Sequence, residues 1–114
     1  MKTTFNSVRR HSGHWVVVVM DLPVRSKCDR ADGRAFKSLL KGMGFKQLQP
    51  SLYARFSFTE TSAEAIRAGV LRKMPPKGKL TIFCLTDFQF QGGIGIDRHE
   101  FRQMPTPLPL ICIV

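Results

Sequence analysis

The sequence predicts a single α+β domain, and three observations lead to that class. The chain has 114 residues, which is the usual length of one domain. Hydrophobic residues make up 43% of it and aromatic residues 10%, a composition typical of a folded protein with a core. Segments with strand-like and helix-like apolar patterns follow one another along the chain. Together they predict the element order β-α-β-β-α-β.

The first half of the chain predicts one strand and one helix. Residues 15–21, WVVVVMD, are mostly β-branched and run into Leu22-Pro23, so we expect a buried strand followed by a turn. From Asp29 onward the apolar residues recur at helical spacing, and Gly42 and Gly44 indicate where the helix stops. The members of this apolar stripe are Ala35, Phe36, Leu39, Leu40 and Met43.

The second half predicts two short strands, a helix and a further strand. Residues 46–58 are extended, with a bend at Gln49-Pro50. A T-x-x-E capping box at residues 61–64 predicts the start of the second helix, and Pro75-Pro76 its end. Its apolar stripe is Ile66, Val70 and Met74. Residues 79–86 form the next strand, and residues 88–96 a turn with a short final strand.

This order is that of the ferredoxin-like fold, an antiparallel sheet with both helices on one face. The strand at 15–21 is apolar on both of its faces, with Val16, Val18 and Met20 on one side and Trp15, Val17 and Val19 on the other. A half-exposed sheet would alternate apolar and polar residues. We therefore expect a homodimer in which the sheet of a second subunit packs on the face opposite the helices.

The domain spans residues 15–97, between a flexible basic arm at 1–14 and a tail at 98–114. The tail ends in LICIV, residues 110–114, after Pro105, Pro107 and Pro109. Prolines at alternate positions favour extended chain. We expect residues 110–114 to add as a strand to a sheet edge of the other subunit or of a partner protein.

The charge balance points to a polyanionic partner. Eighteen Lys and Arg residues against eight Asp and Glu residues give a net charge of +10 and a pI near 10.3, which favours nucleic acid. The exposed side of the first helix supplies Arg30, Arg34, Lys37 and Lys41 as candidate phosphate contacts. Along residues 51–58 we expect Leu52, Ala54, Phe56 and Phe58 in the core. Ser51, Tyr53 and Arg55 then face either phosphate or plain solvent.

Asp21 ends the first strand on the side of Val17 and Val19. If Asp21 lies near the axis of a two-fold dimer, it meets its own copy, and paired carboxylates need a shared proton or a hard cation such as Mg²⁺ or Mn²⁺. The alternative is an Asp that only caps the following turn.

Several other functional classes find no support in the sequence. Cys28, Cys84 and Cys112 show no disulfide or zinc spacing, and no apolar run reaches the roughly 20 residues of a membrane span. Gly93 to Gly95 lacks the remainder of a nucleotide-binding fingerprint. We expect a cytoplasmic protein with no membrane partner.

Four segments resemble the small second core protein of CRISPR adaptation, the partner of the CRISPR integrase. They are residues 16–23, 29–45, 48–55 and 75–90, and the Gln49, Ser51 and Tyr53 spacing with the run 85–87 is most similar to the versions of type II systems. Met20 stands where the family often has Tyr, and the N-terminal arm is longer than usual.

The resemblance implies a homodimer that holds duplex DNA while the integrase inserts it into a CRISPR array. Many members are also magnesium-dependent endonucleases, acting on RNA or DNA, and the resemblance makes Asp21 the metal-binding and catalytic position.

Two alternatives stay open. The RNA recognition motif has the same element order and stacks single-stranded bases on sheet aromatics, but residues 51–58 match its third-strand signature only in part. A non-enzymatic ribosome-associated or regulatory binder would share the charge and the fold and need no role for Asp21.

Overall fold

The computed structural model describes residues 13–97 and 100–105. Almost all of the predicted N-terminal arm and the whole of the 110–114 segment lie outside this range. No helix within it is long and apolar enough to cross a membrane.

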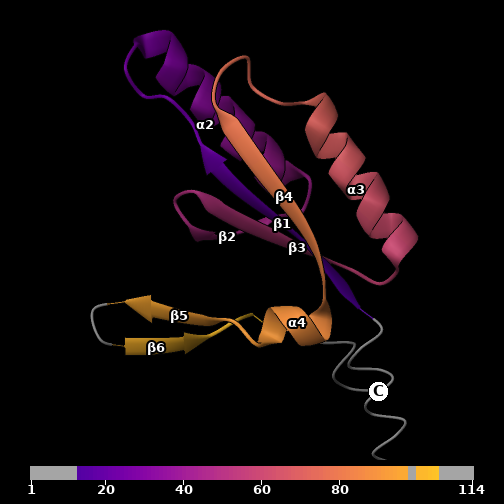
Figure 1. The fold of residues 1–114 in the computed structure, drawn as a ribbon. Helices are drawn as coiled ribbons and strands as arrows, with labels where there is room; N and C mark the ends of the chain where they lie inside the picture. Colours follow the sequence, from indigo (N-terminus) through magenta and orange to yellow (C-terminus); the bar gives the residue numbers. More distant parts are fainter. Residues whose placement is uncertain (1–12, 98–99, 106–114) are drawn as a thin grey trace, which may run out of the picture.

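Four strands form one antiparallel sheet in the order β2-β3-β1-β4 (Figure 1). They are β1 (His14–Asp21), β2 (Lys46–Gln49), β3 (Leu52–Ser57) and β4 (Lys79–Thr86). Helix α2 (Lys27–Gly42) connects β1 to β2, and helix α3 (Glu60–Arg72) connects β3 to β4. The central strand β1 pairs with β3 on one side and β4 on the other. This topology confirms the predicted ferredoxin-like fold.

Helix α2 begins earlier than its apolar stripe indicated. Ser26 is its N-cap: the Ser26 hydroxyl accepts a hydrogen bond from the Asp29 amide at 3.0 Å, and the Asp29 carboxylate accepts one from the Ser26 amide at 3.4 Å. This reciprocal capping box satisfies two amides that the first helical turn leaves unpaired. Past the other end of the helix Gly44 has φ +93°, as the predicted glycine stop requires.

The capping box predicted at Thr61 is wrong. The N-cap of α3 is Thr59, whose hydroxyl accepts from the Ser62 amide at 3.0 Å. Thr59 has an extended backbone and Thr61 already lies inside the helix, so only Thr59 can turn its hydroxyl toward the free amides of the first turn.

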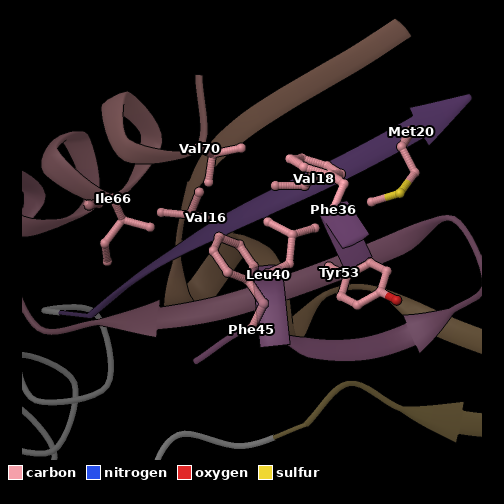
Figure 2. Close-up of a cluster of buried hydrophobic side chains, with 10 residues drawn as sticks. Val16, Val18, Met20, Phe36, Leu40, Phe45, Tyr53, Ile66 and Val70 are labelled. Atoms are coloured by element: carbon pink, nitrogen blue, oxygen red, sulfur yellow. The ribbon is translucent and has the colours of Figure 1, made fainter. Parts of the chain in front are cut away.

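The main core lies between the sheet and the two long helices (Figure 2). Val16, Val18 and Met20 of β1 point into it, as their alternation predicted, and meet Phe36 and Leu40 of α2. The other buried members are Phe45, Tyr53, Ala63, Ile66 and Val70.

The opposite face of the sheet carries a second, smaller core, composed of Trp15, Val17, Ala54 and Phe90. Phe90 belongs to α4 (Asp87–Gln91), a short helix where the sequence predicted a turn. The Trp15 ring stacks on Phe90 with centroids 4.1 Å apart, and the Trp15 indole N–H donates to the Asp87 carboxylate at 2.6 Å.

Helix α4 corrects the expectation that a second subunit must cover this whole face. The chain itself buries the end of β1 that holds Trp15. Toward the other end of β1, Val19 is 37% exposed, and on β4 Phe83, which pairs with Val17, is 48% exposed. Within residues 13–97 and 100–105, this part of the face is open to another molecule.

A hairpin follows α4. Strands β5 (Ile94–Asp97) and β6 (Glu100–Gln103) pair with each other in a separate two-stranded sheet (Figure 1). The predicted domain boundary between residues 97 and 98 therefore falls inside one hairpin.

Candidate nucleic-acid interface

A hollow of about 490 Å³ lies where β1 ends beside α2. It brings together five of the predicted site residues, namely Asp21, Arg30, Arg34, Lys37 and Ser51. The rest of its lining was not predicted from the sequence and includes residues 22–24, Gly33 and Pro50. The hollow thus combines basic side chains with an apolar rim beside the carboxylates of Asp21 and Asp29.

Helical spacing explains why the basic residues share this hollow. Arg30, Arg34 and Lys37 are separated by four and three residues, so they lie along one side of α2. Within the described part of the chain, the side chains of Arg34 and Lys37 make no hydrogen bond or ion pair. Lys41 continues the same stripe but does not line the hollow. Arg34 and Lys37 are therefore the cations best placed to meet an anion here.

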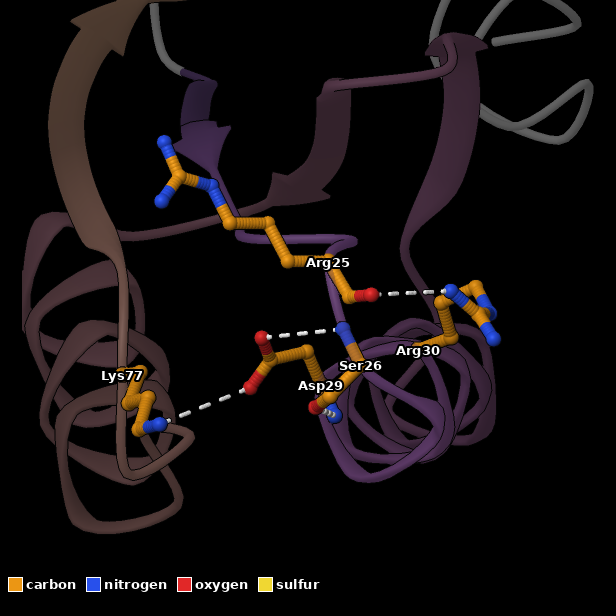
Figure 3. A network of polar contacts seen from close by, with 5 residues as sticks. All are labelled: Arg25, Ser26, Asp29, Arg30 and Lys77. Carbon is orange, nitrogen blue, oxygen red and sulfur yellow. Dashed lines mark hydrogen bonds and ion pairs between the residues drawn. The ribbon is translucent and has the colours of Figure 1, made fainter.

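Arg30 has a different task. Its guanidinium donates to the carbonyl of Val24 at 3.0 Å and to that of Arg25 at 3.4 Å, and Figure 3 shows the second of these contacts. These bonds hold the loop between β1 and α2 against the helix. Because part of the Arg30 guanidinium already donates to these two carbonyls, we assign Arg30 the role of holding the loop that forms the rim of the hollow.

Asp21 is exposed at the end of β1, opposite Lys79 in the β1–β4 register. No group of three or more His, Cys, Asp or Glu side chains that could hold a metal occurs among residues 13–97 and 100–105. Asp29 also lines the hollow, but its carboxylate is engaged by the Ser26 amide and by Lys77 at 3.7 Å. The described part of one chain therefore does not offer a complete metal centre.

Ser51 lines the hollow from the turn between β2 and β3. Its carbonyl accepts from the Met20 amide at 3.0 Å, which ties this turn to the end of β1 next to Asp21. The Ser51 residue is exposed, so its hydroxyl can reach a ligand in the hollow.

The structure corrects the assignment of Tyr53 and Arg55. Tyr53 is fully buried on the helix side of β3, where burial raises the pKa of its phenol; it presents nothing to phosphate. Arg55 is partly buried and donates to the Met43 carbonyl at 2.6 Å, capping the C-terminal end of α2. Conversely Phe58, expected in the core, is 54% exposed. It follows the last residue of β3, so the sheet no longer covers it.

Curated proteins resemble this chain over most of its length, although no protein-family model matches it. It is 35% identical over 99 residues to "CRISPR-associated endoribonuclease Cas2" of Paracidovorax avenae, covering 84% of this chain and 92% of that protein. The protein of the same name from Flavobacterium psychrophilum is 28% identical over 86 residues, covering 75% of each. That from Lacticaseibacillus rhamnosus is 29% identical over 90 residues, covering 76% of this chain and 89% of the relative.

Proposed function

This chain belongs to the Cas2 family, and from that membership we propose that it acts in CRISPR adaptation as a homodimer that binds the backbone of duplex DNA beside the CRISPR integrase. The hollow next to α2 carries this proposal, because Arg34 and Lys37 project there without partners among the described residues. The net charge of +10 supports binding that depends on phosphate rather than on base sequence.

Binding of this kind works by displacing counterions, so it weakens steeply as salt rises. Affinity for duplex DNA is measured by fluorescence anisotropy across a salt series. The double variant Arg34→Ala/Lys37→Ala should lose about tenfold in affinity, and its salt slope should fall by about 1 for each lost phosphate contact. Arg67→Ala, an exposed arginine on α3 away from the hollow, is the matched control and should change little.

The alternative, an RNA recognition motif, predicts a different binding profile in the same experiment. A clear preference for single-stranded RNA with weak salt dependence would contradict backbone binding. Trp15 is buried under α4 and Tyr53 under the helices, so neither of these rings can stack on bases.

We further propose that the dimer is a nuclease dependent on Mg²⁺ or Mn²⁺, as the endoribonuclease name of the relatives suggests. One Asp21 falls short of a metal site, and Asp21 of a second copy would supply the missing carboxylate if the exposed end of the sheet face is the dimer interface. A cation bound there would neutralise charge on the scissile phosphate and lower the pKa of a water nucleophile.

Asp21→Asn tests this activity, because the amide keeps the shape and removes the charge. We expect cleavage of RNA or DNA with added Mg²⁺ or Mn²⁺ to be lost, while duplex affinity stays within about twofold, since Arg34 and Lys37 remain. If the variant cleaves at the wild-type rate, Asp21 is only a turn residue.

The proposed association with the CRISPR integrase needs a separate experiment. A tagged CRISPR integrase should retain this protein on a column, and deletion of residues 110–114 should weaken either that capture or the dimer. If neither changes, the proposed strand addition by the tail fails.

A further inference from the structure

The turn that leads into β4 packs directly on the segment that carries Asp21. In this turn Gly78 has φ +109°, a backbone conformation that residues with a side chain rarely adopt. A Cβ atom placed on Gly78 would lie 2.9 Å from the Asp21 carbonyl oxygen and 2.8 Å from a methyl carbon of Leu22. The backbone of this turn thus reaches the end of β1 at a distance that only glycine permits.

A second contact joins the same turn to α2. Figure 3 shows Lys77, next to Gly78, beside Asp29 in the first helical turn, with 3.7 Å between the ammonium and the carboxylate. Asp29 in turn caps the helix through Ser26. The turn therefore contacts both walls of the hollow, the end of β1 through Gly78 and the start of α2 through Lys77.

We propose that Gly78 is a positioning residue that fixes the Asp21 carboxylate relative to the α2 cations. Any larger residue pushes the Asp21 carbonyl away and with it the end of β1, which is held on its other side by the bond from the Met20 amide to the Ser51 carbonyl. A displacement of about 1 Å is enough to reduce a reaction about a hundredfold when it moves a reacting group. The inference rests on the role proposed above for Asp21.

The test compares Gly78→Ala with Gly42→Ala, whose new Cβ would have no atom within 4 Å. Amide hydrogen exchange measures position without relying on activity. In Gly78→Ala the Met20 amide should exchange at least about tenfold faster, while that of Val16, in the middle of the core, stays unchanged. A general loss of stability would speed exchange at both amides and would overturn the proposal.

Activity gives the second readout. Gly78→Ala should lower the rate of Asp21-dependent cleavage by about tenfold or more with duplex affinity within about twofold. Lys77→Ala should have a small effect on both, because an ion pair with an exposed lysine contributes little. If Gly78→Ala does not fold, Gly78→Asn replaces it, because Asn tolerates positive φ better than Ala.

The outcomes separate the two proposals. If the wild type shows no Asp21-dependent cleavage, the nuclease proposal fails, and hydrogen exchange at Met20 alone decides the role of Gly78. If Asp21→Asn abolishes cleavage while Gly78→Ala leaves both cleavage and Met20 exchange unchanged, Gly78 has no positioning role.

Discussion

The two faces of the central sheet differ in how far other elements of the chain cover them. On the helix side, α2 and α3 close a core of ten buried residues. On the other side, α4 covers only the end that holds Trp15, and Val19 and Phe83 stay exposed. The helices of the same chain therefore cover the first face. The described residues cover only part of the second face, and the exposed part includes the side on which β1 terminates at Asp21.

The strongest test of this contrast removes the contact that holds α4 in place. Asp87→Ala deletes the acceptor of the Trp15 indole N–H and of the Gln91 side-chain amide. We expect a loss of about 3 kcal/mol in the free energy of unfolding, because the buried indole N–H of Trp15 is left unpaired, whereas the Gln91 amide still donates to the Pro105 carbonyl. Trp15 is the only tryptophan, so its fluorescence follows urea unfolding and reports exposure of the ring.

The control for that experiment is Asp32→Ala, which removes an exposed acid of α2. It should change stability by less than about 0.5 kcal/mol. Equal losses in the two variants would mean that α4 is not anchored through Asp87.

Substitutions of two neighbouring valines compare how much each face of the sheet contributes to stability. Val18 is fully buried on the helix side, and Val19 points the other way. Val18→Ala should cost about 2 kcal/mol of unfolding free energy, from lost burial and the cavity left behind. Val19→Ala should cost less than about 1 kcal/mol in a dilute sample, where no dimer covers it. Similar costs at low concentration would show that the open end is already covered within the chain.

Phe83 tests what covers the open end. Phe83→Ser removes an apolar ring from the surface that we propose for the dimer, so the dimer dissociation constant in analytical ultracentrifugation should rise about tenfold, which is about 1.4 kcal/mol. Phe58→Ser removes an equally exposed ring from the end of β3 and serves as the control. A dimer insensitive to Phe83→Ser would place the interface elsewhere.

The smallest expected effect is at Tyr53, whose buried hydroxyl has no hydrogen-bond partner among the residues that the structure describes. Tyr53→Phe should leave stability at neutral pH unchanged or raise it by up to about 1 kcal/mol, because the unpaired hydroxyl carries a desolvation cost. The effect is measured by urea unfolding at pH 7.

The same residue gives a pH dependence. Burial raises the pKa of Tyr53 above its ordinary value, so above about pH 10 the unfolded chain loses this proton while the folded chain keeps it. Stability from this group is therefore present below pH 10 and decreases as the pH rises toward the folded-state pKa. Tyr53 is the only tyrosine, so tyrosinate absorbance follows it alone, and Tyr53→Phe should flatten the alkaline decrease. An equally steep decrease in the variant would assign it to other groups.

The sequence predicted the strands and the long helices correctly where a periodic pattern was long. The alternation along β1 assigned Val16 and Trp15 to opposite faces, and the two cores confirm that assignment. Helix α4 was missed because its five residues are too few to show a helical period. Tyr53 was misplaced because β3 lies inside the sheet with buried residues on both faces, so alternation did not show which face was polar.

By itself the sequence determined the basic surface and the stripe of Arg30, Arg34 and Lys37, because helical spacing is a local property of the chain. Only the tertiary structure decided which of these side chains are free. The bonds from Arg30 to the loop before α2, the link from Met20 to Ser51, and the packing of Gly78 on Asp21 join segments that are distant in sequence or depend on loop conformation. Such contacts are set by strand register and close packing, which no local pattern encodes.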